Sequence, residues 1–338
     1  MKKLIKPLIV KFFQKALVQA DIQKTLVEIQ AKRVNSIGLI DNLENPYTSI
    51  DVPKSEQGEG VVFITGRFRS GSTLLWNLFR QSDEFTAFYE PFNERQWFNP
   101  QMRGDTVDST HRGVDDYWRE FDGLDALTPL YDENWIRDDL FMNEHSYMPN
   151  MKAFIDTIIE SSSTRPILQF NRVDFRLTWL KKQYPKASII HLYRNPRDQW
   201  CSFLIDKKRM NKDCVEETYV DNFYLDIWCE DLYRHFPFLH AQQTRHPYKR
   251  FYYIWKLSYI FGQTHSNLSI SYEDLVANPE NVVGEILTVI RADKSLLDKV
   301  GATISVTSVD AWKAYAPEDW FLIKELECER VLQSFLRK

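Results

Sequence analysis

The sequence predicts an α/β fold in which helices cover both faces of a mostly parallel β-sheet. Short apolar segments at 61–65, 167–170, 187–193 and 268–271 have the pattern of buried strands. Helical spacing of apolar residues recurs at 151–162, 176–184, 196–208 and 279–291. Strands that alternate with helices form crossover units, and the strands of such units run parallel.

The other segments are placed around this sheet. The strand at 61–65 runs into a glycine-bearing loop, and a helix begins at 74–80. Two long helical patterns occupy 215–235 and 247–262. Residues 95–150 combine many acids with turn residues and weak periodicity, which predicts an irregular, partly helical insertion. We expect one domain over 56–338, preceded at 1–55 by a basic helical segment and a linker.

The first 35 residues carry seven lysines and one arginine against Asp21 and Glu28, a net charge of +6. Their apolar residues have helical spacing, so residues 1–30 form either a helix packed on the domain or an amphipathic helix on an anionic membrane. Lys6, Pro7 and Lys11 interrupt the apolar runs, and we expect this segment to be retained rather than cleaved.

Composition excludes several classes of function. The net charge of −4 over 338 residues argues against nucleic-acid binding, which needs a basic face. The four cysteines form no C-x-x-C pair and no metal-ligand spacing. A chain of this length builds its core without disulfides, so a reducing, cytoplasmic compartment is expected, with membrane association if the first helix binds lipid.

The loop after the first strand has the spacing Gly66-x-x-x-x-Gly71 of a nucleotide phosphate loop. Its backbone N–H groups and the following helix N-terminus predict an anion site. A nucleoside triphosphatase has lysine at the next position, whereas this chain has Ser72 and then Thr73. Arg69 supplies the positive charge instead, which suits one phosphate with a leaving group to stabilise.

A second motif follows the strand at 187–193, where Arg194 precedes a helix that contains Ser202. With the phosphate loop, this spacing resembles the family of sulfotransferases that use 3′-phosphoadenosine 5′-phosphosulfate (PAPS). The resemblance implies their P-loop-like α/β fold, and it implies that Arg194 and Ser202 bind the 3′-phosphate. Tyr272, at the end of the last predicted strand, resembles the aromatic residue that lies beside the nucleotide.

Within that family the chain is most similar to the carbohydrate and protein-tyrosine branches. Glu90 follows Arg69 by 21 residues, as the catalytic glutamate of those branches follows the basic residue of the loop. The segment 170–175 resembles one that supplies a catalytic lysine, although Arg172 stands at that position. An arginine keeps the charge but has a planar, forked shape.

The resemblance implies a role for each candidate residue. Glu90 would be the general base, and Arg69, with Arg172, would stabilise charge on the leaving oxygen. His191 is the alternative base, since the cytosolic branch of the family uses a histidine, although its place inside an apolar strand favours a core residue. No metal is implied. The expected nucleotide-binding residues are Arg67, Arg69, Ser70, Gly71, Ser72, Thr73, Arg194, Ser202 and Tyr272.

Two other functions stay open, namely a P-loop kinase for a small hydroxylated substrate and a catalytically inactive nucleotide-binding protein. For a sulfotransferase we expect a hydroxyl-bearing acceptor, such as a glycan, on the side of the insertion. Aromatic residues at 96–98, 117–118 and 222–228 are candidates for its walls. Residues 105–144 carry twelve acids and three arginines, a net charge of −9, so we expect a carboxylate-edged cleft that favours neutral or amine-bearing glycans.

Overall fold

The structure is a computed structural model that describes Gln19 and residues 60–304 and 309–336. The predicted N-terminal helix and its membrane contact lie outside the described residues. The chain divides into the units Met1–Ser55 and Glu56–Lys338, and the second unit is described below. Among the described residues, no helix is long and apolar enough to cross a membrane.

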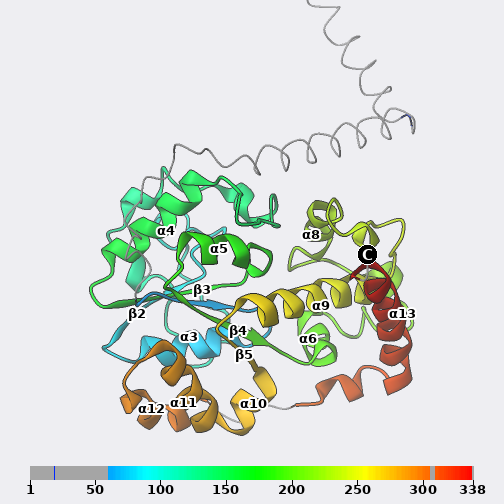
Figure 1. Ribbon diagram of the computed structural model, residues 1–338. Coiled ribbons are helices and arrows are strands. Elements are labelled where there is room, and N and C mark those ends of the chain that lie inside the picture. Colours follow the sequence, from blue (N-terminus) through cyan, green and yellow to red (C-terminus); the bar gives the residue numbers. More distant parts are fainter. Residues whose placement is uncertain (1–18, 20–59, 305–308, 337–338) are drawn as a thin grey trace, which may run out of the picture. The chain divides into compact units, whose positions relative to one another are not determined.

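A parallel sheet of five strands forms the centre of the described chain (Figure 1). Its order is β2-β3-β1-β4-β5, and every adjacent pair runs parallel. The central strand β1 is fully buried, which fits its run of apolar residues. The α/β fold class predicted from the sequence is confirmed. The strands are β1 (Val62–Thr65), β2 (Phe85–Tyr89), β3 (Arg165–Phe170), β4 (Ser188–Tyr193) and β5 (Leu268–Ser271).

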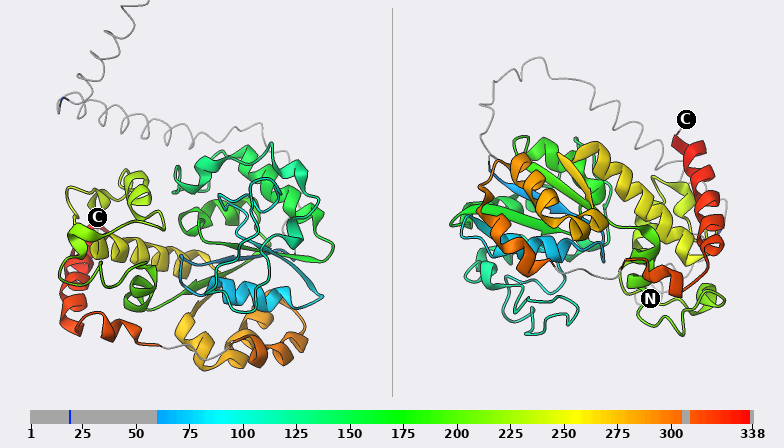
Figure 2. Two further views of the ribbon diagram at one scale, coloured as in Figure 1. Left: turned by 180° about the vertical axis from the view of Figure 1, so that it is seen from behind. Right: turned by 90° about the horizontal axis from the view of Figure 1, so that it is seen from below.

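Helices pack on both faces of this sheet (Figures 1 and 2). On one face, α3 (Ser72–Arg80) contacts β1, β2 and β3, and α11 (Pro279–Ile290) contacts β4 and β5. Next to them lie α10 (Tyr272–Ala277) and α12 (Leu297–Thr303). On the other face, α9 (Pro247–His265) contacts β4 and β5 and packs against α5 (Leu177–Gln183). Helix α4 (Pro149–Ser161) lies on this side as well.

A second hydrophobic cluster lies beside the sheet and is built by helices. It combines α6 (Pro196–Phe203), α8 (Leu225–Leu232), one side of α9, and α13 (Glu318–Leu336), a helix that the sequence analysis did not predict. The long helix predicted over 215–235 is wrong, because α7 (Val215–Thr218) and α8 are separate. Between them Asp221 accepts hydrogen bonds from the backbone N–H groups of Phe223 and Asp226, which replaces helical pairing with a turn.

The insertion has the irregular form that the sequence predicts. Its regular elements are the short 3₁₀ helices η1 (Arg119–Phe121), η2 (Asp125–Leu127) and η3 (Glu133–Ile136). Arg176, fully buried in η4 (Asp174–Arg176), donates to the carbonyls of Trp135, Asp138 and Asp139 at 2.8–3.2 Å. Burial lowers the pKa of Arg176 to about 10. This side chain ties the insertion to the sheet through carbonyls that would otherwise lack donors.

Candidate active site

The loop between β1 and α3 takes its shape from two glycines. A Cβ on Gly66 would come within 2.6 Å of Ser70 Oγ and 2.8 Å of the Leu192 carbonyl oxygen. Gly71 has a φ of 97°, and a Cβ there would lie 2.4 Å from the ring of Tyr272. Other residues are therefore strained at both positions. The close turn leaves the first N–H groups of α3 at an open helix end, which favours an anion.

A cavity of about 660 Å³ lies in front of this loop. Residues that follow each of the five strands contribute to its wall, as expected for a ligand site at the carboxyl ends of parallel strands. The cavity brings together most of the predicted site residues although they are far apart in the sequence. Those that line it are Arg69, Gly71, Ser72, Thr73, Glu90, Arg172, Arg194, Ser202 and Tyr272.

Two of the predicted nucleotide-binding residues, Arg67 and Ser70, are not part of the cavity wall. The guanidinium of Arg67 is buried 4.1 Å from the ring centroid of Trp228 and 3.6 Å from Asp174 Oδ2. Burial lowers the pKa of Arg67 to about 10, although Asp174 opposes this shift. Ser70 is fully buried, and its N–H donates to the Arg67 carbonyl at 3.0 Å. Both side chains support the loop from behind.

Glu90 is buried at the end of β2 and accepts three hydrogen bonds. Its Oε2 accepts hydrogen bonds from Asn93 Nδ2 and Arg172 Nη1, each at 2.8 Å, and its Oε1 accepts one from Asn171 Nδ2. The backbone of Glu90 has a φ of 39°, which is rare outside glycine. The Tyr89 side chain also interacts with this carboxylate. Glu90 is therefore held in one orientation at the cavity wall.

Arg172 joins two carboxylates of the cavity. Its Nη1 binds Glu90, and its Nη2 donates to Glu94 Oε2 at 2.7 Å. The guanidinium also lies 4.9 Å from the ring centroid of Phe68 and 5.5 Å from that of Tyr224. Burial lowers the pKa of Arg172, but the two glutamates outweigh it and raise the pKa above its ordinary value. A permanently charged, forked donor thus stands between the two carboxylates.

The sequence analysis missed three amides that complete this network. Asn171 Oδ1 accepts from Ser72 Oγ at 3.0 Å and from Gln169 Nε2 at 2.8 Å, and Asn93 holds Glu90 from the turn after β2. The signal was their position just after or near the ends of β2 and β3, because polar residues at these strand ends face the site. Through Asn171, the phosphate loop and Glu90 are connected.

Arg69 and Arg194 stand at the other end of the cavity. Arg69 has a φ of 66°, and its Nε donates to Ser202 Oγ at 3.0 Å. Arg194 Nη1 donates to the Arg69 carbonyl at 3.2 Å, and its guanidinium lies 4.6 Å from the ring centroid of Tyr272. In the part of the chain that the structure describes, the buried Nε atoms of Arg194 and Arg172 have no hydrogen-bond partner. An anionic ligand would supply the missing acceptors.

The comparison with protein families settles the class. The family model described as "Sulfotransferase family" matches residues 61–293, more than half of the chain. The chain belongs to the sulfotransferase family.

Solved structures similar to this sulfotransferase have low sequence identity. A sulfotransferase from Alicyclobacillus acidocaldarius has a TM-score of 0.38 and 14% identity, with 82% of this chain and 95% of that chain covered. The sulfotransferase domain from the curacin biosynthetic pathway has a TM-score of 0.39 and 15% identity, with 82% of this chain and 97% of that chain covered. A sulfotransferase from Mycobacterium avium has a TM-score of 0.44 and 12% identity, with 83% of this chain and 76% of that chain covered. No curated protein matches the chain.

The insertion of this sulfotransferase lines the cavity with residues 106–117, but its acids point elsewhere. Among the described residues, Asp108 is the one of the twelve acids in 105–144 that lies in the cavity wall. The expectation of a carboxylate-edged cleft is therefore wrong. The charged residues in the wall are the arginines Arg69, Arg95, Arg112, Arg172 and Arg194 and the acids Glu90, Glu94 and Asp108. This surplus of positive charge fits a bisphosphate.

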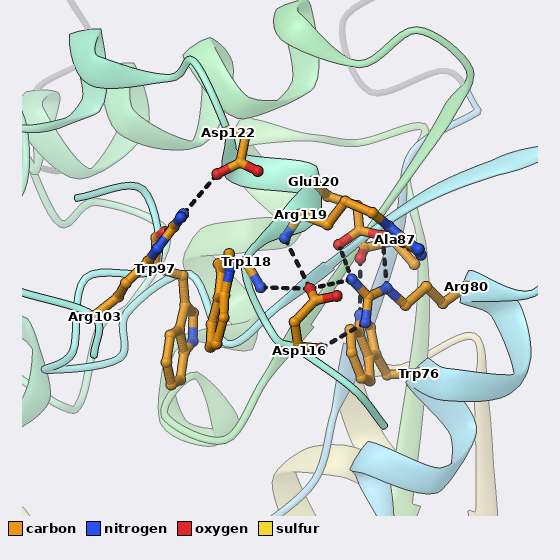
Figure 3. Close-up of polar contacts among 10 residues, drawn as sticks. All are labelled: Trp76, Arg80, Ala87, Trp97, Arg103, Asp116, Trp118, Arg119, Glu120 and Asp122. Atoms are coloured by element: carbon orange, nitrogen blue, oxygen red, sulfur yellow. Dashed lines mark hydrogen bonds and ion pairs between the residues drawn. The ribbon is translucent and has the colours of Figure 1, made fainter. Parts of the chain in front are cut away.

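Many of the other acids make structural contacts (Figure 3). Arg80 at the end of α3 binds Asp116 Oδ1 at 2.5 Å and Glu120 Oε1 at 2.6 Å, with Trp76 stacked beneath it. Arg103 binds Asp122 at 2.6 Å. The ion pairs of Arg80 hold the insertion against α3, and the Arg103–Asp122 pair joins two parts of the insertion. The net charge of the insertion can be counted from the sequence. The arginines that pair with its acids in the fold cannot be identified in that way.

Some of the aromatic residues predicted to contact the acceptor line the cavity, and others belong to the hydrophobic core. Trp97, Tyr117, Phe223 and Tyr224 line the cavity, whereas Trp228 belongs to the helical core. The aromatic segments predicted from the sequence thus supply one face of the site. A cavity with flat aromatic side chains and hydrogen-bonding groups is suited to a ring-shaped acceptor.

His191 does not lie in the cavity wall of this sulfotransferase. Its Nδ1 contacts Ser269 Oγ at 2.7 Å, and its ring fills the space beside Gly262, where a Cβ would lie 2.1 Å away. Burial lowers the pKa of His191 to about 4. His191 is a core residue, so Glu90 is the base candidate that faces the cavity.

Proposed function

We propose that this sulfotransferase moves a sulfuryl group from PAPS to a hydroxyl group of an acceptor, with a carbohydrate or glycoconjugate as the acceptor class. One observation carries the proposal: a single cavity joins the phosphate loop, the pair Arg194 and Ser202, and the held carboxylate of Glu90. A nucleotide with phosphates at both ends of its ribose and an acceptor hydroxyl need these three groups in one place.

The nucleotide half of the proposal rests on anion-binding groups. Gly71, Ser72 and Thr73 would hold the 5′-phosphate with the first N–H groups of α3. Arg194 and Ser202 would hold the 3′-phosphate, beside the ring of Tyr272. The unpartnered Nε of Arg194 supports this assignment, because a phosphate oxygen satisfies it. Arg67 and Ser70 would support the loop from behind.

Bound PAPS supplies the sulfuryl group. The side chains of the protein position the acceptor hydroxyl and stabilise the charge that develops during transfer. Glu90 takes the proton of the acceptor hydroxyl while the new O–S bond forms. Arg69 stabilises the charge that remains on the 5′-phosphate as the old S–O bond breaks. Arg172 keeps Glu90 oriented through its 2.8 Å contact. No metal is needed for these roles.

The acceptor class and the compartment are supported by different observations. The partly exposed Phe223 and Tyr224 offer flat surfaces on which a sugar ring packs. The four cysteines are thiols, three of them buried, which supports the proposed reducing, cytoplasmic compartment. An acceptor screen across sugars, lipid-linked glycans and phenols tests the first point.

A dialysed sample tests the reaction itself. With sulfur-labelled PAPS and no added magnesium, we expect label to be transferred to an acceptor of the screen. Phosphate-labelled ATP with magnesium is the control and should label nothing. Transfer from ATP would replace the proposal by a kinase. Binding of adenosine 3′,5′-bisphosphate (PAP) without transfer to any acceptor or to water would point to a catalytically inactive nucleotide-binding protein.

A further inference from the structure

His111 lines the cavity from the insertion, and the proposed function gives it no role. Its Nδ1 lies 2.5 Å from the hydroxyl of Tyr117. The ring of Tyr117 stacks on that of Tyr89, with centroids 4.5 Å apart and planes at 17°. Tyr89 in turn precedes Glu90 and contacts Thr73 Oγ1 at 3.0 Å through its hydroxyl. His111 is therefore fixed to both the base and the phosphate loop.

The hydrogen bonds of Tyr117 are compatible with a proton on Nε2 of His111. The Tyr117 hydroxyl accepts the backbone N–H of Asp108 at 3.0 Å and lies 2.5 Å from His111 Nδ1, to which it can donate its own proton. Burial raises the pKa of Tyr117 to about 12, which keeps the phenol protonated. A neutral imidazole that accepts at Nδ1 carries its proton on Nε2. Among the described residues, no hydrogen-bond partner of His111 Nε2 occurs.

Contacts of the segment 108–111 place His111 near Arg69 and Glu90. Arg69 Nη1 donates to Thr110 Oγ1 at 3.3 Å and lies 3.7 Å from Asp108 Oδ2. The ring centroid of His111 lies 6.3 Å from that of Tyr89, the residue before Glu90. Burial and Arg69 lower the pKa of His111, while Asp108 and Glu90 oppose them without reversing the shift. In the proposed function Arg69 serves the leaving oxygen and Glu90 the attacking oxygen, and His111 lines the same cavity as both.

We propose that His111 is a neutral hydrogen-bond donor that contacts the transferring sulfuryl group through Nε2. This assignment rests on the proposed function. The bond would fix the sulfuryl group on the side opposite the phosphate loop, with Tyr117 and Asp108 as positioning residues that hold the tautomer. A neutral donor serves this role without adding a second positive charge beside Glu90, which already pairs with Arg172.

Two probes isolate this contact, because PAPS has the sulfuryl group and PAP lacks it. His111→Asn keeps a polar atom near Nδ1 for Tyr117 and removes the donor at Nε2, whereas His111→Gln places an amide near Nε2. We expect His111→Asn to weaken PAPS binding about 3–10-fold, the effect of one neutral hydrogen bond, with PAP binding unchanged. His111→Gln should bind PAPS more tightly than His111→Asn.

Nitrogen-15 NMR of the wild-type imidazole gives a second test that needs no variant. The Nε2–H tautomer should be present, and the Nε2 signal should move with PAPS more than with PAP. Equal loss of both nucleotides in His111→Asn, unchanged PAPS binding, or an Nδ1–H tautomer would each overturn the inference. If the wild type binds neither nucleotide, the proposed function itself fails and the assignment falls with it.

Discussion

Arg69 Nε donates a hydrogen bond to Ser202 Oγ at 3.0 Å, although the two residues are 133 positions apart in the chain. This bond links the phosphate loop to α6 across the cavity. Arg194 adds a second link, because its Nη1 donates to the Arg69 carbonyl. The side chains assigned to the two phosphates of the nucleotide are thus in direct contact with one another.

Arg194→Ala should weaken binding of PAP by roughly 1.5–3 kcal/mol, because a charge-assisted hydrogen bond to the 3′-phosphate is lost. Binding of adenosine 5′-monophosphate should change much less. Isothermal titration calorimetry measures both ligands. Arg209→Ala, an exposed arginine outside the cavity, is the matched control and should leave both affinities unchanged. Equal losses for the two nucleotides would show that Arg194 does not bind the 3′-phosphate.

Glu90→Gln should lower turnover by ~10²–10⁴-fold, the usual contribution of a general base, while PAP affinity stays unchanged. Glu94→Gln is the matched control, since Glu94 binds the same arginine but its side chain is 42% exposed. We expect the control to keep most of its turnover. Release of labelled sulfate or sulfated acceptor from PAPS measures the rate. Near-normal turnover in Glu90→Gln would remove this residue from the mechanism.

Asp116→Asn should lower the free energy of unfolding by about 1–3 kcal/mol, because it weakens a charge-assisted contact with the buried Arg80. The neighbouring Asp115 is exposed, and Asp115→Asn should change stability by less than about 0.5 kcal/mol. Urea unfolding measures both variants. Neither should alter acceptor preference, since neither acid lines the cavity. A changed preference in Asp115→Asn would restore these acids as specificity determinants.

Stability should fall on acidification because His191 is buried without charge. Its folded-state pKa of about 4 lies below the ordinary value near 6.5, so only the unfolded chain takes up a proton between these values. The contribution of neutral His191 to the free energy of unfolding is complete above about pH 6.5 and decreases by roughly 3 kcal/mol towards pH 4. His246, whose pKa is also lowered to about 4, acts in the same window.

The slope of stability against pH separates these contributions. Urea unfolding at several pH values between 7.5 and 4 should show a smaller loss for His191→Gln than for the wild type. His145 is exposed, and His145→Gln should keep the wild-type slope. Identical slopes in all three proteins would mean that His191 is not buried in its neutral form.

The strand pattern of the sequence was sufficient for four strands of the sheet but not for β2, one of its two edge strands. Strand β2 (FTAFY) is as apolar as the strands that were predicted, but it leads directly into the Glu90 motif, which drew the interpretation away from a strand. The helix predicted over 215–235 failed because Asp221 binds backbone N–H groups that a continuous helix would use. Periodicity does not detect such a local competitor.

The candidate site was predictable where a motif has a fixed spacing. Arg69, Arg194 and Ser202 meet in one cavity, as the loop and strand-end motifs indicated. The partners of Glu90 were not predictable, because Asn93 and Asn171 come from different strand ends and meet only through the sheet order β2-β3-β1. Pairing of that kind depends on which strands are neighbours, and one sequence does not give this order.

The carbonyl contacts of Arg176 also set the order in which the chain can assemble. The ribosome makes Asp139 37 residues before Arg176, so the insertion emerges without the donor that later binds its carbonyls. Until β3 and η4 have been synthesised, the segment around Trp135 relies on water for these hydrogen bonds. The insertion therefore completes its folding only after downstream residues arrive, and a nascent chain that ends before residue 176 should remain sensitive to protease at 135–139.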